Sequence, residues 1–478
     1  MFQQRRPASV LLNDSTSGTE RAIQRDDGNA FRSSVYQSGV SVIQRPSEVI
    51  ELQTLAEEGP AQDDGALNND PEPAVEKSTE AYIVLVGVWC SMILCTGIAN
   101  TIGTFQAYLG NNQLKNYSSQ QIGWIFSTHI FLFLLGGAQA GPLFDAYSLR
   151  PLLIPGYIGF VAAMMAFSAC TEYYQFMLSF GILGGLSASI LWTTGLATIG
   201  HWFYYKRAIA TGLATSAGPI GGILFPILFE KLIPKIGFAW TVRTIGFICL
   251  AFGLMAITLM RPRLPPTRTL RWNANFSSFT DIRFILTTLG MFALELAVLI
   301  PSSYITTYAL YIGMPSSLSY QLLAYQNAAQ ILGRILPNWI ADYWGRFNTM
   351  VLSSLPCAIV ILVLWLKAST TASVIAFAVL FGLLSGTTSS LMAVCLSQLC
   401  RTEEYGSKYG ITYLVISPAS LIGIPIAGAI LNEGGGGAKN SKNFQGLIIF
   451  CGTFYLLGSA FFALARIAGV GIKVRKVY

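Results

Sequence analysis

The sequence predicts an all-α membrane protein whose twelve transmembrane helices form two pseudo-symmetric bundles of six. Hydrophobic residues make up 53% of the 478-residue chain and charged residues only 11%, whereas an average soluble protein carries about 25% charged residues. Apolar runs long enough to cross a bilayer recur from Ala81 onward. The longest interruption between them, residues 261–281, divides these runs into six and six. Such a composition excludes a soluble enzyme.

The first 80 residues are predicted to form a disordered, acidic, cytosolic tail. They hold 14 acidic residues against seven Lys or Arg and show no sustained apolar period. A segment of this kind cannot bury enough apolar surface to offset the entropy of ordering. The first 30 residues contain no apolar core of a signal peptide, so we expect the first membrane helix to act as its own insertion signal.

The apolar runs that follow are each bounded by charge, Pro, Asn or Gly, as expected of spans that end at the membrane surface. The twelve expected spans are about 81–108, 121–144, 151–170, 174–199, 207–232, 237–260, 282–309, 317–340, 349–368, 373–399, 408–431 and 444–467.

These spans predict four further segments after the tail. They are an N-terminal six-helix bundle (81–260), a cytosolic linker (261–281), a C-terminal six-helix bundle (282–467) and a cytosolic basic tail (468–478). The linker carries four arginines and two adjacent prolines, which suits a polar connection rather than a thirteenth span.

Basic residues predict the orientation. If the N-terminal tail is cytosolic, the outer loops hold only six lysines: Lys115, Lys231, Lys235, Lys367, Lys439 and Lys442. Most other Lys and Arg residues between the spans then lie inside, so the positive-inside rule places both termini in the cytosol. We expect a multi-pass protein of the plasma membrane. The sequon at Asn116 falls in an outer loop so close to the bilayer that it is only a weak glycosylation candidate.

Several partner classes are not expected. The net charge of +7 is spread between apolar segments and makes no basic face, so a nucleic-acid partner is not predicted. We found no paired carboxylates, metal-ligand cluster or phosphate-binding loop, so the sequence predicts no catalytic residues, no metal and no cofactor. The expected partners are the lipid bilayer, a small-molecule substrate and protons, and we expect a monomer.

Two inner loops resemble each other. One carries Asp145 and Arg150 between the second and third spans, and the other carries Asp342 and Arg346 between the eighth and ninth. A charge pair at the cytosolic ends of neighbouring helices can latch one state of a moving bundle, because its loss must be compensated in the other state. We therefore expect gating latches here, with ordinary interfacial charges as the alternative.

Four further segments follow a known pattern. They are residues 100–108, 201–212, 237–243 and 333–337, the last followed by Asp342 and Gly345-Arg346. Together with the twelve spans, they resemble the major facilitator superfamily over about residues 80–467, and within it the fungal branch of the monocarboxylate-porter family. The resemblance implies the major facilitator fold and secondary transport of organic anions or related small molecules by alternating access, commonly coupled to protons.

The sequence departs from this family pattern at three places. Carriers of simple monocarboxylates in that family have a lysine where this chain has Asn100, and an acid where it has Gln330. The motif that opens the first helix is reduced to Glu80-Ala81-Tyr82. These departures favour a larger or neutral substrate over a lactate-type one.

Two charged residues lie in the middle of predicted spans, where an ionised group costs at least about 2.5 kcal/mol. Arg334 in the eighth span is expected to be a fixed positive partner for a substrate carboxylate or phenolate; the alternative is a structural pair or a side chain that snorkels to the inner face. Gln330, one turn earlier, would share its helical face. Glu295 in the seventh span is a proton-carrier candidate, or else a partner of Arg334 or Arg243. Arg243 itself is expected to be a gate or packing residue.

Neutral polar and small residues complete the expected site. Asn100, Gln106 and Tyr304 offer hydrogen bonds to a ligand, or bridge neighbouring helices. Close helix packing is expected at Gly212, Gly218, Pro219 and Gly222. Part of this run, 218–222, also resembles a motif of proton-coupled drug exporters, which modestly favours efflux.

The function predicted is secondary active transport of a small organic anion or related metabolite, with proton coupling. One alternative is an efflux pump for a fungal secondary metabolite. Others are an importer of a riboflavin-like vitamin and a transporter-like nutrient receptor that signals through its tail.

Overall fold

The computed structural model describes residues 76–266, 268, 279–400, 405–432 and 441–471. All of them belong to one compact unit, Asn68–Tyr478. The predicted tail up to residue 75, most of the second half of the linker and the last seven residues lie outside the described residues.

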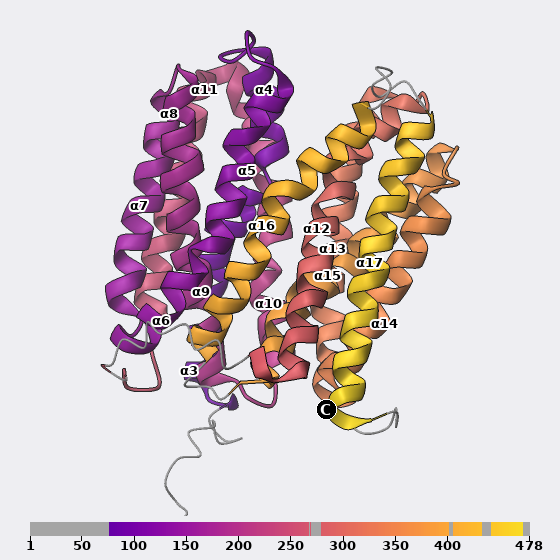
Figure 1. The fold of residues 1–478 in the computed structure, drawn as a ribbon. Coiled ribbons are helices and arrows are strands. Elements are labelled where there is room, and N and C mark those ends of the chain that lie inside the picture. Colours follow the sequence, from indigo (N-terminus) through magenta and orange to yellow (C-terminus); the bar gives the residue numbers. More distant parts are fainter. Residues whose placement is uncertain (1–75, 267, 269–278, 401–404, 433–440, 472–478) are drawn as a thin grey trace, which may run out of the picture. The chain divides into compact units, whose positions relative to one another are not determined.

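The first half is built from helical segments that run back and forth between two ends of the bundle (Figure 1). They are α3 (Thr79–Met92), η1 (Ile93–Gly97), α4 (Ile102–Asn111), α5 (Ser119–Leu135), α6 (Gly137–Tyr147), α7 (Arg150–Ala169), α8 (Tyr173–Phe176), η2 (Met177–Gly184), α9 (Gly185–Trp202), α10 (Arg207–Thr215) and α11 (Ala217–Leu259).

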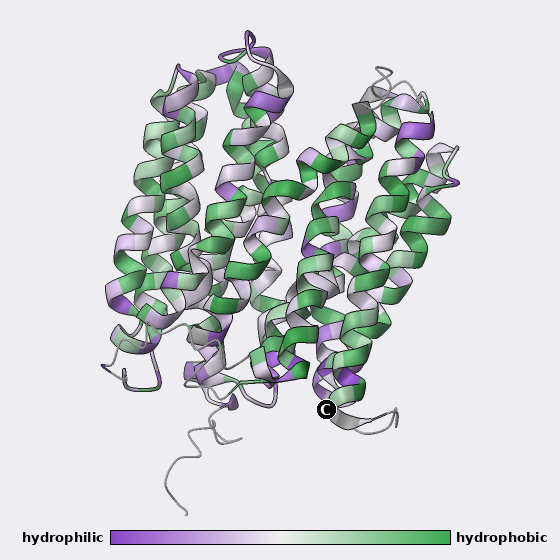
Figure 2. Cartoon of the chain, in the orientation of Figure 1, coloured by the Kyte–Doolittle hydropathy of each residue, from purple (hydrophilic) through white to green (hydrophobic). Residues whose placement is uncertain are grey.

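The second half repeats the pattern. Its segments are α12 (Ile282–Tyr311), α13 (Ser316–Trp344), α14 (Arg346–Ile359), η4 (Val360–Trp365), α15 (Thr371–Gln398), α16 (Tyr405–Asn432) and α17 (Ser441–Val470). Hydrophobic residues dominate the middle of the helices, and hydrophilic residues gather at both ends (Figure 2). Large apolar side chains stay exposed along the spans, Ile158 by 65% and Leu254 by 57%, which suits contact with lipid rather than water.

These segments account for the predicted fold. Ten stretches of the described chain are helical, long and apolar enough to cross a membrane. One of them, Arg207–Leu259, contains two crossings, because the backbone turns at Gly237 with φ +75°, a conformation open to glycine. A further crossing is α13, which is 29 residues long and more polar than the ten. The all-α fold of twelve spans is therefore confirmed.

The two halves meet chiefly through four spans, with a further contact between α10 and α15. In the first half these are α5 with α6 and α10 with α11; in the second half they are α13 and α16. Helices α10 and α11 pack against α13, while α5 and α6 pack against α16. We call the end of the bundle where the 203–206 loop meets Asp342 and Arg346 the latch end.

Proline explains one break in these spans. The fifth span divides at Ser216 into α10 and α11, with Pro219 in the first turn of α11. Proline has no N–H, so it cannot donate to the carbonyl four residues earlier, that of Thr215. The Thr215 carbonyl is thus left to find a donor elsewhere.

Candidate functional site

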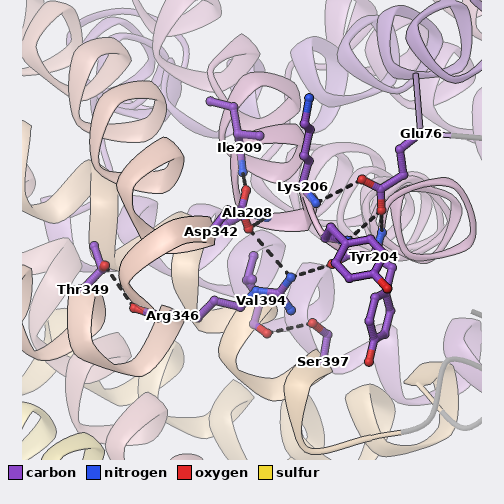
Figure 3. A network of polar contacts seen from close by, with 12 residues as sticks. Glu76, Tyr204, Lys206, Ala208, Ile209, Asp342, Arg346, Thr349, Val394 and Ser397 are labelled. Atoms are coloured by element: carbon purple, nitrogen blue, oxygen red, sulfur yellow. Dashed lines mark hydrogen bonds and ion pairs between the residues drawn. The ribbon is translucent and has the colours of Figure 1, made fainter. Parts of the chain in front are cut away.

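Asp342 joins the two halves at the latch end. This residue near the end of α13 accepts hydrogen bonds from Ala208 N at 3.0 Å and Ile209 N at 2.9 Å (Figure 3). Both N–H groups belong to the first turn of α10, whose unpaired donors and partial positive charge favour a carboxylate. One acidic side chain thus holds a helix start in the opposite half.

Arg346 reinforces this contact. Its Nη2 lies 3.7 Å from Asp342 Oδ1 and donates to the carbonyl of Tyr204 at 2.6 Å. The predicted pair of Asp342 and Arg346 is therefore present. The shorter contact of Arg346, however, is with the Tyr204 carbonyl in the 203–206 loop of the first half.

The corresponding loop of the first half differs from the prediction. Among the described residues, Asp342 pairs with Arg346 and Asp281 with Arg283, but no ion pair between Asp145 and Arg150 is found. Asp145 instead lies against the backbone of Gly406, where a Cβ atom would come within 2.6 Å of its Oδ1. Gly406 is in the first turn of α16, so in both halves the acid approaches a helix start in the other half. The base was the wrong partner to expect, because a helix N-terminus offers several donors at once.

The two loops also share a backbone turn. Ser148 and Gly345, each three residues after the acid, have φ values of 70° and 104°. Gly345 adopts this conformation easily, whereas Ser148, with ψ −169°, occupies a region that is nearly restricted to glycine.

We expect Ser148→Gly to stabilise the folded protein by about 1 kcal/mol, because it relieves this backbone strain. The thermal unfolding midpoint in detergent measures the gain. The control is Ala146→Gly in the helical part of α6, which should lower the midpoint by the usual cost of glycine in a helix. If the unfolding midpoint fell equally in both variants, the backbone strain at Ser148 would be contradicted.

Arg334 supplies the donor that Pro219 removes. Its side chain is buried, and its Nη1 donates to Thr215 O at 2.8 Å, which is a bond between the halves. Its Nε has no hydrogen-bond partner among the residues that the structure describes. The contact supports a structural role for Arg334 in this conformation, since its Nη1 already donates to the Thr215 carbonyl.

Small residues of the fifth span permit this contact. A Cβ on Gly212 would collide with the backbone carbonyl of Arg334. One on Gly222 would lie 2.8 Å from the Cβ of Asn100 and 3.0 Å from the amide nitrogen of Asn327. At Gly218 it would lie 2.8 Å from Thr96 Oγ1. Glycine therefore brings α10 and α11 close to both the first and the eighth spans.

A column of tyrosines was missed in the sequence. Tyr405, Tyr409 and Tyr413 follow one face of α16, with ring centroids 5.6 and 4.1 Å apart. The Tyr409 hydroxyl accepts a hydrogen bond from Trp192 Nε1 of α9 at 2.6 Å. The guanidinium of Arg207 lies 5.3 Å from the centroid of the Tyr405 ring. The spacing of four residues was the available signal for this column, which connects α16 to α9 and α10 of the first half.

Among the described residues, the other predicted site residues are not linked into one network of hydrogen bonds or ion pairs. Glu295 on α12 is half-buried, and no ion pair or hydrogen bond of its side chain is found among the described residues. Its expected pairing with Arg334 or Arg243 is therefore not seen. Arg243 bonds Ser168 Oγ at 3.1 Å and lies 5.0 Å from the Trp240 ring, both within the first half, so it packs there.

The neutral polar residues are distributed over several helices. Asn100 lies at a break in the first span and is exposed, while Gln106 and Gln330 are partly exposed. Tyr304 donates to Ile424 O of α16 at 3.4 Å. An exposed amide in mid-span suits a water-filled space better than lipid. Asn116 is exposed between α4 and α5, in a loop opposite the latch end.

A family comparison accounts for this architecture. The model of the Major Facilitator Superfamily matches residues 84–423, and a second match covers residues 322–473. The chain belongs to the major facilitator superfamily. It is therefore a multi-pass membrane transporter of small molecules and not an enzyme.

Two relatives of the transporter come from fungi. It is 35% identical to the fujikurins efflux protein of Gibberella fujikuroi, over 83% of this chain and 85% of that protein. It is 31% identical to the riboflavin transporter of Saccharomyces cerevisiae, over 85% of this chain and 82% of that protein.

Solved structures share the fold at lower identity. A crystal structure of the E. coli fucose:proton symporter matches with a TM-score of 0.62 and 16% identity, over 80% of this transporter and 99% of that chain. At this identity the likeness extends to the fold alone.

Proposed function

We propose that the transporter is a secondary active exporter of a fungal-type secondary metabolite and works by alternating access. The observation that carries the proposal is the bond of Asp342 to the start of α10, because this contact between halves must break before the latch end can open. Export is supported by the 35% identity to a protein named for fujikurin efflux. The basic loops support a cytosolic latch end, so we propose that this conformation is closed on the cytosolic side of the plasma membrane.

The substrate we propose is larger than a simple monocarboxylate. Asn100 offers only neutral hydrogen bonds where the monocarboxylate-porter pattern has a lysine, and Gln106, Gln330 and Tyr304 are likewise uncharged. The Arg334 guanidinium is already bonded to Thr215 O, so only its remaining donors could meet a weakly acidic group. These residues suit an amphipathic metabolite held by several neutral contacts. Membership of the monocarboxylate-porter branch remains part of this proposal.

A second candidate is uptake of a riboflavin-like vitamin. It is supported by the 31% identity to the yeast riboflavin transporter. Import and export use the same architecture, since the direction depends on gradients and coupling.

Transport in proteoliposomes tests the proposal. The purified protein is given a panel of lactate, riboflavin and an extract of fungal metabolites, with and without a proton gradient, and the trapped compounds are identified by mass spectrometry. We expect at least one extract metabolite to accumulate several-fold over protein-free liposomes under the gradient. Accumulation of riboflavin alone would favour the second candidate, and accumulation of lactate would contradict the substrate class.

A further inference from the structure

A buried acidic residue precedes the first membrane helix. Glu76 lies just before α3, in the segment assigned from the sequence to the disordered tail, yet only 2% of its surface is exposed. Its Oε1 accepts hydrogen bonds from Tyr204 N at 2.5 Å and Tyr205 N at 2.6 Å, and its Oε2 accepts one from Lys206 N at 3.2 Å. The segment that leads into α3 is thus tied to a loop about 130 residues away in the chain.

That loop leads into the helix that Asp342 holds. Lys206 is the N-cap of α10, and the next two donors bonded across the latch are Ala208 N and Ile209 N. Figure 3 shows the two carboxylates on either side of this helix start, Glu76 from the first half and Asp342 from the second. Together they accept five of the N–H groups between residues 204 and 209.

Tyr204 connects both sets of contacts. Its N–H donates to Glu76 at 2.5 Å, and its carbonyl accepts from Arg346 Nη2 at 2.6 Å. The orientation of this one peptide segment therefore decides whether Arg346 finds its acceptor. A carboxylate that fixes the N–H groups of 204–206 also fixes the direction of the carbonyl that Arg346 uses.

The two carboxylates differ in what must happen when the transporter opens at the latch end. The bonds of Asp342 and Arg346 join different halves and must break. Those of Glu76 stay within the first half, because α3, the 203–206 loop and α10 all belong to it. Glu76 can therefore keep the 203–206 loop ordered while the latch end is open. The surface that Asp342 and Arg346 contact is then already formed when the latch end closes.

We propose that Glu76 is a positioning residue of the latch, holding the 203–206 loop ready for Asp342 and Arg346 and thereby favouring the state closed at the latch end. This inference rests on the proposed alternating-access function. A simple anchoring role for the N-terminal segment would stabilise both states equally and leave their ratio unchanged.

Charge alone predicts the opposite sign. Glu76 and Asp342 approach the same helix start, and like charges repel. If repulsion were decisive, a neutral residue at position 76 would strengthen the hold of Asp342 on α10. If loop ordering is decisive, the same change weakens the closed state, because a glutamine oxygen replaces two carboxylate oxygens and adds an unwanted donor.

The experiment measures the distance between spin labels across the latch end by pulsed electron paramagnetic resonance. Labels are placed on the full-length chain at Tyr147→Cys in the first half and Tyr343→Cys in the second, which are 56% and 66% exposed. The native cysteines of the described residues are buried, except for the partly exposed Cys400, which is replaced by Ser in every sample. The protein is reconstituted in liposomes and compared with Glu76→Gln and with Glu80→Gln, an exposed glutamate in the first turn of α3.

We expect Glu76→Gln to raise the ratio of long to short distances at least threefold, and Glu80→Gln to leave it unchanged. Glu76→Asp keeps the charge with a shorter reach and should give an intermediate ratio; it also serves as the test if the glutamine variant does not fold. A fall in the ratio would show that repulsion is decisive, and an unchanged ratio with a lower unfolding temperature would reduce Glu76 to an anchor. Either result overturns the proposal. If the unsubstituted protein shows a single distance under all gradients and substrates, the alternating-access function fails instead.

Discussion

We expect Arg334→Met to shift the transporter strongly away from the state closed at the latch end. The variant keeps an unbranched apolar stem, shorter than that of arginine, but leaves the buried Thr215 carbonyl without a donor, because Pro219 provides none. An orphaned buried acceptor costs about 1–3 kcal/mol, and about 1.4 kcal/mol is a tenfold change in an equilibrium. Spin-label distances and the thermal unfolding midpoint should both report the change.

Pro219→Ala provides the decisive comparison. It restores an N–H four residues after Thr215, so the helix can satisfy the carbonyl without Arg334. The double variant should therefore lose less than the sum of the two single changes, with a coupling of about 0.5–3 kcal/mol. Arg243→Met is the matched control, because its hydrogen bond to Ser168 stays within one half. Strict additivity would mean that Arg334 acts through another partner, such as the substrate.

Glu295→Gln should abolish transport driven by a proton gradient, with at least a tenfold loss of accumulation. The residue is half-buried in the seventh span, and no ion pair to it is found among the described residues, so its carboxyl group is available to carry a proton. Glutamine keeps the shape and a hydrogen-bonding oxygen but cannot be ionised.

Exchange of substrate across the membrane without a gradient separates coupling from binding. This exchange should survive in Glu295→Gln within about twofold, since alternating access itself does not need the proton. Glu230→Gln, an exposed glutamate of α11, is the control and should leave both activities intact. Loss of exchange in Glu295→Gln would assign the residue to substrate binding or packing instead.

Features of the sequence that extend over many neighbouring residues predicted the fold well. Each span is a local run of apolar residues, so its place follows from composition along about 20 positions. Even α13, which is more polar than the ten apolar stretches, was predicted as the eighth span at about 317–340. The acid of each repeated loop was also found, since it stands beside the same kind of turn in both halves.

Partners that lie far apart in the chain could not be predicted in this way. Trp192 and Tyr409 are 217 residues apart, and Arg334 and Thr215 are 119 apart. Glu76 was assigned to the tail because its neighbours in the chain are polar, whereas its hydrogen bonds are with residues 204–206. The local sequence around either partner does not indicate such a tertiary contact.

The sequence by itself determined that this chain crosses a membrane twelve times in two related halves, because the cost of placing polar backbone and side chains in lipid acts on each segment separately. Only the tertiary structure decided which acid holds which helix start, and which carbonyl Arg334 serves. Those choices depend on how closely glycines such as Gly212 let two helices approach, a distance set by the packing of both halves together.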